Sequence, residues 1–236
     1  MTKIKAVLFD LDDTLYDHRF SSRKGLERLK NNFECFREIP LDELEKEHLK
    51  LLNEIHLSKV LAGLCTIEEA REERYRRLFS KYGVKADTQL IEEARLLYST
   101  AYRGNQRAVP GAIELLQRLK TNFKIAVISN NFGVEQKSKI DVCGFGKYLD
   151  AVVTSAEVGF TKPSPEIFLL ALEKLKCSPD EAVMIGDSWE SDIIGARNAG
   201  IRAIWFNRYG NKSPEPSSVV EVDSFLPAEN ISSLIV

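Results

Sequence analysis

The segment VLFDLDDTL, residues 7–15, decides the fold of this chain. Its apolar run ends abruptly at Asp10, and a second carboxylate and a hydroxyl follow at Asp12 and Thr14. Alternate residues of an extended strand point to the same side, so Asp10 and Asp12 converge where the strand leaves the core. Two acids at one point indicate a metal site or a reaction centre. An Asp-rich turn is the plainer alternative, because Asp caps helices and tolerates turn geometry.

Composition narrows the functions open to the chain. With 236 residues, 44% of them hydrophobic, it can build one large domain or two smaller ones around a proper core. The 33 basic and 35 acidic residues are well mixed, so we expect no nucleic-acid and no membrane partner, and a small-molecule substrate instead. The four cysteines form no Cys-x-x-Cys pair, which indicates reduced thiols, and no segment is typical of a signal peptide or membrane span. We therefore expect a cytoplasmic protein.

Residues 21–104 have a charged, helical pattern. Asp42 with Glu45, and Thr66 with Glu69, have the spacing of a capping box, which predicts two helix starts. The apolar residues after each start fall on one helix face. We therefore expect amphipathic helices that bury one stripe against each other.

From Ala108 onward, short apolar runs alternate with helical stretches, which predicts a parallel sheet with helices on both faces. The strand at residues 4–10 is of the same kind and pairs most simply with these later strands, so the helical block becomes an insertion. The Ser- and Pro-rich tail from Asn207 carries no predicted strand or helix. The later strands are expected at 124–129, 150–154, 182–186 and 203–206, with helices at 111–120 and 191–199.

Polar residues stand where three of these strands end. Ser129 and Asn130 close one strand, and Asp187 follows Gly186 at the end of another. Each pattern alone is also typical of a turn or helix cap. In an open parallel sheet, however, ligands bind beyond the carboxyl ends of the strands, where Asp10, Ser129 and Asp187 would meet.

Lys162 lies just before a predicted helix start, with Ser164 as the N-cap and Pro165 at the first helical position. Most loop lysines are solvated, but one fixed beside a helix N-terminus suits a phosphate. A further acid, Asp192, follows the Gly-Asp turn, next to Ser191, the expected N-cap of the next helix.

In order and spacing, these four strand-end motifs resemble those of the haloacid dehalogenase-like (HAD) hydrolase superfamily, in its phosphatase branch with a helical cap inserted after the first motif. The resemblance implies an α/β fold with a Rossmann-like parallel-sheet core, helices on both faces and an inserted all-α cap. The core would comprise residues 1–16 and 107–236, and the cap residues 17–106.

The resemblance also implies roles for the site residues. Asp10 would be the nucleophile that forms an aspartyl-phosphate, and Asp12 the general acid and base. Lys162 would neutralise the phosphoryl group and hold Asp10. The residues implied to bind substrate are Thr14, which orients the first loop, Ser129, Asn130 and Lys162.

The implied cofactor is Mg2+. Its ligands would be the side chains of Asp10 and Asp187 and the backbone carbonyl of Asp12. Asp192 is expected to support this shell or pair with Lys162 rather than to bind the ion.

The function implied is a Mg2+-dependent phosphatase, a monomer or small homo-oligomer, acting on a small phosphorylated metabolite of the nucleotide, sugar or glycolate phosphate class. A phosphomutase would use the same residues, and a catalytically idle binding protein could retain the same fold. The dehalogenase branch is disfavoured, because it lacks the second Asp of the first motif and the Gly-Asp turn. We expect His18 to be a surface residue at the hinge of the cap and Tyr16 to pack in that hinge. Trp189 is expected to pack in the core or at the rim of the site. Contact with substrate is the alternative for each.

Overall fold

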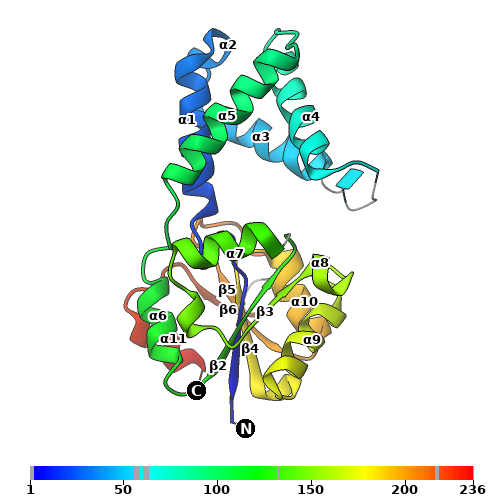
Figure 1. Ribbon diagram of the computed structural model, residues 1–236. Coiled ribbons are helices and arrows are strands. Elements are labelled where there is room, and N and C mark those ends of the chain that lie inside the picture. Colours follow the sequence, from blue (N-terminus) through cyan, green and yellow to red (C-terminus); the bar gives the residue numbers. More distant parts are fainter. Residues whose placement is uncertain (1–2, 56–58, 61–63, 132, 216–217, 236) are drawn as a thin grey trace. The chain divides into compact units, whose positions relative to one another are not determined.

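The computed structural model describes residues 3–55, 59–60, 64–131, 133–215 and 218–235 (Figure 1). The chain divides into two compact units, Met1–Asp17 with Arg107–Val236 and His18–Gln106. We call them the α/β unit and the helical unit. The sequence placed the boundaries at residues 16 and 106, and the roles of the two units as catalytic core and cap stay predictions.

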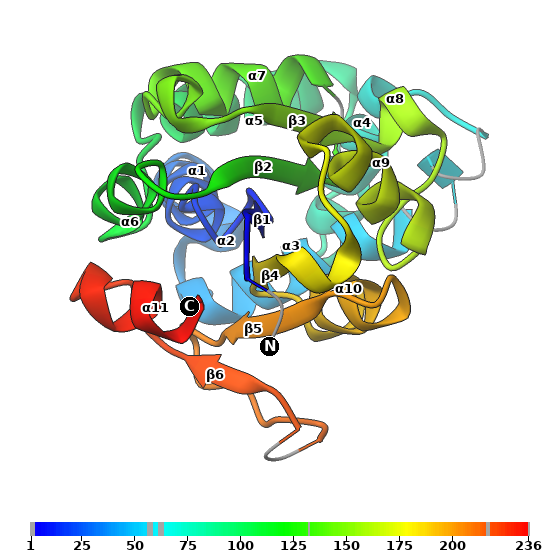
Figure 2. The same cartoon turned by 90° about the horizontal axis from the view of Figure 1, so that it is seen from below.

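The α/β unit contains a six-stranded sheet in the order β3-β2-β1-β4-β5-β6, with every neighbouring pair parallel. This confirms the predicted α/β fold. The sheet appears edge-on in Figure 2, with helices on both of its faces. The strands are β1 (Ala6–Phe9), β2 (Lys124–Ser129), β3 (Ala151–Thr154), β4 (Ala182–Gly186), β5 (Arg202–Phe206) and β6 (Val220–Val222).

The strand β1 lies between β2 and β4 at the centre of the sheet. Phe9 is level with Val127 of β2 and with Ile185 of β4. Because all three strands run in the same direction, the residues that follow them leave the sheet at one edge. The polar residues after these strands are therefore brought together by the register.

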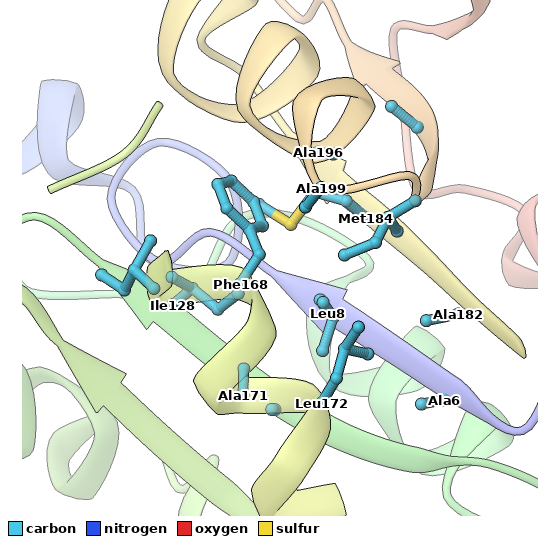
Figure 3. Packing of buried hydrophobic residues seen from close by; sticks show 14 of the residues in the cluster. Ala6, Leu8, Ile128, Phe168, Ala171, Leu172, Ala182, Met184, Ala196 and Ala199 are labelled. Atoms are coloured by element: carbon cyan, nitrogen blue, oxygen red, sulfur yellow. The ribbon is translucent and has the colours of Figure 1, made fainter. Parts of the chain in front are cut away.

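The apolar core on one face of the sheet is built from alternate residues of the strands, because successive side chains of a strand point to opposite faces. Leu8 and Met184 belong to the cluster that packs under Phe168 (Figure 3). Phe168 comes from α9 (Pro165–Leu175), which covers this face of the sheet together with α10 (Gly195–Asn198). Each such buried apolar side chain stabilises the fold by about 1.5–3 kcal/mol.

The opposite face carries α6 (Ala112–Leu119) and α11 (Ala228–Ile235), which pack on each other (Figure 2). Neither α11 nor β6 was expected in the tail from Asn207. Phe206 at the end of β5 stacks on Phe225, with ring centroids 4.0 Å apart, which ties the tail to the sheet. The shorter or peripheral elements of this unit are α7 (Gly133–Val142), η2 (Gly146–Tyr148), α8 (Ser155–Val158), η3 (Pro179–Glu181) and η4 (Trp189–Ile194).

The predicted cap at Ser191 is wrong. The N-cap lies three residues earlier, at Ser188, and the helical segment begins at Trp189 with the π-helical η4. The Ser188 hydroxyl accepts the backbone N–H of Ser191 at 3.2 Å. Ser191 is thus the residue that is capped, inside the first turn.

The helical unit consists of α1 (His18–Asn32), α2 (Glu34–Arg37), α3 (Leu41–Ile55), α4 (Ile67–Lys81) and α5 (Thr88–Gly104). The predicted capping box of Thr66 and Glu69 is confirmed at the start of α4. The one predicted for Asp42 and Glu45 is wrong, because α3 already begins at Leu41. The Glu45 carboxylate is buried and accepts instead from the guanidinium groups of Arg19 and Arg23.

Within the described part of the chain, none of the helices has both the length and the hydropathy needed to cross a membrane. All four cysteines are free and partly buried.

Candidate active site

The carboxyl edge of the central strands gathers the predicted site residues. Asp10 follows β1, Ser129 ends β2 and Asp187 follows β4. Lys162 reaches the same place from the loop before α9. Residues far apart in the sequence thus meet at the edge that the parallel register predicts.

Lys162 is held between two acids. Its Nζ donates to Asp10 Oδ1 at 2.5 Å and to Asp192 Oδ1 at 2.6 Å. All three residues are buried, with exposed fractions of 4%, 7% and 0% respectively. The predicted pairing of Asp192 with Lys162 is confirmed. An ammonium in this position faces any anion that approaches Asp10.

Asn130 fixes the backbone on which Lys162 stands. Its side-chain Nδ2 donates to the Lys162 carbonyl at 2.9 Å, and its Oδ1 accepts the Lys162 N–H at 2.7 Å. This pair of bonds joins the end of β2 to the loop before α9. The contacts of Asn130 are those of a residue that positions Lys162; its binding of substrate stays a prediction.

The site brings three acidic side chains close to one lysine. Ligand oxygens of Asp10, Asp187 and Asp192 lie within 4.8 Å of one another, and the ammonium group hydrogen-bonded among them is that of Lys162. Burial, together with the charge of Asp192 and against that of Lys162, raises the pKa of Asp10 to about 7. Burial and the charges of Asp10 and Asp192 also raise the pKa of Asp187 well above its usual value. Burial alone would lower the pKa of Lys162, but Asp10 and Asp192 hold it above its ordinary range.

These residues fit a divalent cation. Among the described residues, Asp10 Oδ2 is a buried oxygen with no hydrogen-bond partner. Both oxygens of Asp192 are already used, by Lys162 and by the N–H of Ser188 at 3.0 Å. Asp10 and Asp187, the predicted ligands, would therefore hold the ion, and an all-oxygen set of carboxylates suits Mg2+. The part of the Asp12 carbonyl in the metal shell stays a prediction.

The loop that carries Asp187 is fixed from two sides. The Thr14 hydroxyl accepts the Asp187 N–H at 3.1 Å and donates to Asp187 Oδ1 at 3.3 Å. The indole N–H of Trp205 donates to the Asp187 carbonyl at 2.8 Å. Thr14, predicted to bind substrate, makes these contacts to the loop of Asp187.

Gly186 allows Asp192 to approach the end of β4. A Cβ atom added at position 186 would lie 2.3 Å from Asp192 Oδ2, far inside van der Waals contact. Any other residue would displace Asp192, and with it one of the two carboxylates that hold Lys162. The glycine of the Gly-Asp turn is thus explained by close packing.

Asp12 has partners that the sequence did not suggest. Its Oδ1 accepts from Lys139 Nζ at 2.6 Å, and its Oδ2 accepts from Gln136 Nε2 at 2.9 Å and from Asn131 Nδ2 at 2.8 Å. These donors suit the ionised carboxylate, which only accepts hydrogen bonds. Gln136 also donates to the hydroxyl of Ser129 at 2.5 Å. The signal that would have found Gln136 and Lys139 is their three-residue spacing on α7, which places them on one helix face.

The remaining candidates, Tyr16, His18 and Trp189, have neighbours within the protein, and contact with substrate stays the alternative for each. Tyr16 is fully buried, as expected of hinge packing. His18 is partly buried and its Nδ1 lies 2.8 Å from the hydroxyl of Tyr102, so it is not a free surface histidine. Trp189 is buried edge-on against Trp205, with ring centroids 5.1 Å apart, which confirms its packing role.

The family of the chain follows from its sequence match. The model of the haloacid dehalogenase-like hydrolases matches residues 4–200. The chain belongs to this family. The HAD-like assignment made from the four strand-end motifs is therefore confirmed, and the protein is a hydrolase.

Relatives of this HAD-like hydrolase cover almost its whole length. N-acylneuraminate-9-phosphatase of Homo sapiens is 29% identical, over 96% of this chain and 95% of the relative. The glyceraldehyde 3-phosphate phosphatase of Methanothermobacter thermautotrophicus is 34% identical, over 86% of each chain. The HAD-hydrolase YfnB of Bacillus subtilis, in a magnesium-bound crystal structure, superposes with a TM-score of 0.76 at 24% identity over 99% of each chain. The last likeness shows the shared fold.

Proposed function

We propose that this protein is a Mg2+-dependent phosphatase that hydrolyses a small phosphorylated metabolite through an aspartyl-phosphate on Asp10. The observation that carries the proposal is the Lys162 ammonium held 2.5 Å from Asp10, beside an Asp10 oxygen that has no partner among the described residues. This pairing leaves a carboxylate oriented by a cation and unused on its other oxygen. The names of both curated relatives, as phosphatases, support the same reaction.

In the first half of the reaction, a carboxylate oxygen of Asp10 attacks phosphorus and the bond from phosphorus to the ester oxygen breaks. Asp12 starts this half in its protonated form, which the negative charge of the bound phosphate favours. As the general acid it gives this proton to the departing oxygen, so the product leaves as an alcohol. A carboxylate meeting a phosphate dianion needs positive charge to approach, and Lys162 supplies it. Ser129 donates its hydroxyl to a phosphoryl oxygen.

In the second half, water attacks the phosphorus of the phospho-Asp10 group. Asp12, now a carboxylate, takes a proton from the water, the bond from phosphorus to Asp10 breaks and inorganic phosphate is released. The nucleophile and the acid are both regenerated. Asp12 therefore serves both halves, as acid and then as base.

The size of the rate acceleration indicates which residues contribute most to catalysis. The uncatalysed hydrolysis of phosphate monoesters is accelerated by up to ~10^21-fold in enzymes, or roughly 29 kcal/mol at about 1.4 kcal/mol per decade. A general acid contributes about 10^2- to 10^4-fold. The larger part must come from positioning and charge, for which Lys162 and the donors around it are placed. When bound by Asp10 and Asp187, Mg2+ would add Lewis-acid stabilisation of the phosphoryl oxygens.

The test is a phosphate-release assay over a panel of nucleotide, sugar and glycolate phosphates, with and without a chelator. We expect Mg2+-dependent release from at least one class, and none from the Asp10→Asn variant. Asp141→Asn, an exposed carboxylate on α7, is the matched control and should keep full activity. Acid quenching during turnover should leave a phosphoryl group on the peptide that contains Asp10.

Three results would overturn the proposal. Full activity of Asp10→Asn would remove Asp10 from the chemistry. Turnover that needs a bisphosphate activator, without net phosphate release, would indicate a phosphomutase. Failure to act on any member of the panel, or on an aryl phosphate, with Mg2+ present would indicate a binding protein.

A further inference from the structure

One face of α7 presents two buried polar side chains to Asp12. Gln136 is fully buried and Lys139 is 5% exposed, whereas Lys137 between them is exposed. Lys139 Nζ binds Asp12 Oδ1 at 2.6 Å, and Gln136 Nε2 binds Asp12 Oδ2 at 2.9 Å. Each oxygen of the carboxylate is thus held by a different residue of one helix, which restricts rotation of the carboxylate plane.

Lys139 has two neighbours that fix its ammonium. Its Nζ also lies 5.2 Å from the centroid of the Tyr16 ring, at a distance where a cation is attracted to the face of an aromatic ring. Tyr16 is fully buried and its backbone forms an isolated bridge with Asp12. The ammonium is therefore held by the same loop whose carboxylate it orients.

Gln136 connects two parts of the site. Its single amide nitrogen donates to Asp12 and, at 2.5 Å, to the hydroxyl of Ser129. Within the described chain its Oε1 is buried without a hydrogen-bond partner. A buried amide carrying an unpaired oxygen is costly, so the site keeps it at the expense of stability.

We propose that Lys139 and Gln136 are positioning residues that hold Asp12 at the angle and distance needed for proton transfer, and that Gln136 ties this geometry to Ser129. The proposal rests on the proposed function, in which Asp12 is the general acid and base. The plainer reading is that Lys139 only neutralises a partly buried charge. The two interpretations predict different effects of removing Lys139 on the kinetic constants of different substrates.

The leaving group separates the two readings. An aryl phosphate such as p-nitrophenyl phosphate releases a stable anion and depends little on the general acid, whereas an alkyl phosphate releases a poor leaving group and depends on it strongly. A displacement of about 1 Å costs up to ~10^2-fold in rate. Hydrolysis of phospho-Asp10 is common to both substrates, so the comparison uses kcat/KM, which reports the first half of the reaction. We expect Lys139→Met to lower kcat/KM ~10- to 100-fold for an alkyl phosphate and far less for p-nitrophenyl phosphate. Gln136→Met should show the same selectivity and also raise KM, because Ser129 loses its donor.

The matched control is Lys137→Met, which removes an exposed lysine from the same helix and should leave both substrates unaffected. Lys139→Arg keeps a cation and should recover part of the alkyl-phosphate activity. In the Asp12→Asn background, Lys139→Met should cause no further loss, since residues that act as a unit are non-additive. If circular dichroism shows that Lys139→Met does not fold, the alkyl and aryl phosphates are compared in Lys139→Arg and Gln136→Met instead.

Equal losses for the two substrates, or full additivity with Asp12→Asn, would overturn the positioning role while leaving the phosphatase proposal intact. Wild-type alkyl-phosphate turnover in Lys139→Met would do the same. If Asp12→Asn itself turned over an alkyl phosphate at the wild-type rate, the role of Asp12 in the proposed function would fail first.

Discussion

The indole N–H of Trp205 supports the backbone of Asp187. The two residues lie on the adjacent strands β5 and β4 or just beyond, and the bond from Trp205 Nε1 to the Asp187 carbonyl is 2.8 Å long. A side chain from the next strand thus fixes the loop whose carboxylate is predicted to hold the metal. Such outer contacts orient ligands and typically change metal affinity about 10- to 100-fold when lost.

We expect Trp205→Phe to raise the Mg2+ concentration for half-maximal activity about 10-fold, because the ring is kept and the donor is removed. Titrating Mg2+ against phosphate release measures this. Trp189→Phe, on the other member of the aromatic pair, is the control and should leave the Mg2+ requirement unchanged. Equal Mg2+ dependence of Trp205→Phe and the wild type would show that the bond is not needed to orient Asp187.

Metal binding should be visible in stability as well as in activity. The pKa of Asp187 is raised by burial and by Asp10 and Asp192, so without metal the folded state binds more protons than the unfolded one as pH rises above about 3.9, and stability falls. Asp187→Asn should therefore raise Tm in the presence of a chelator. With Mg2+ at about 100 times its Kd, the wild type should gain about 2.7 kcal/mol and the variant much less. Thermal unfolding of the wild type and the variant, each with chelator and with Mg2+, checks this. A variant that melts below the wild type in chelator, or that gains as much from Mg2+, would contradict it.

Gly186→Ala should damage both stability and catalysis. The new methyl group would meet Asp192 Oδ2 at 2.3 Å and push away a carboxylate that holds Lys162. Overpacking of this kind costs about 1–3 kcal/mol. Gly146→Ala is the control, since the nearest atom to its added Cβ is 3.9 Å away. Urea unfolding and kcat should separate the two variants, and a Gly186→Ala protein as stable and active as the wild type would rule out the tight contact.

His48 of α3 predicts a pH dependence of stability. Burial, with the charges of Arg74 and His18, lowers its pKa well below the ordinary value of 6.5, and neither ring nitrogen has a partner among the described residues. As pH falls below about 6.5, the unfolded state takes up a proton that the folded state does not, so stability decreases by about 1.4 kcal/mol per pH unit until the folded pKa is reached. His48→Phe should reduce this slope between about pH 6.5 and 5 in urea unfolding followed by circular dichroism. Parallel pH profiles for the two chains would show that His48 is protonated in the fold.

Much of the site was predictable because it depends on backbone register. Asp10, Ser129 and Asp187 each end or follow an apolar run, and parallel strands bring such ends together whatever the intervening loops do. Lys162 was recognisable from the Ser-Pro helix start that follows it. The N-cap position of Ser164 is confirmed, although its hydroxyl bonds the Glu166 side chain and caps no backbone N–H.

Other features were not predicted from the sequence, for identifiable reasons. Gln136 and Lys139 are polar residues buried on α7, so a search for apolar periodicity assigns that face to solvent. The strand β6 has only three residues, none of them fully buried, and carries no alternating pattern. Glu45 has the spacing of a capping residue, but the nearby guanidinium groups of Arg19 and Arg23 pair with it more strongly than a backbone N–H.

The position of β1 has a consequence for biosynthesis. This strand precedes both of its partners in the sheet, Lys124–Ser129 and Ala182–Gly186, by more than 100 residues of chain. During synthesis, the segment that carries Asp10 can pair only after these later strands have emerged from the ribosome. The contiguous stretch His18–Gln106 has its own contacts available earlier. The candidate active site is therefore completed after the helical unit can fold.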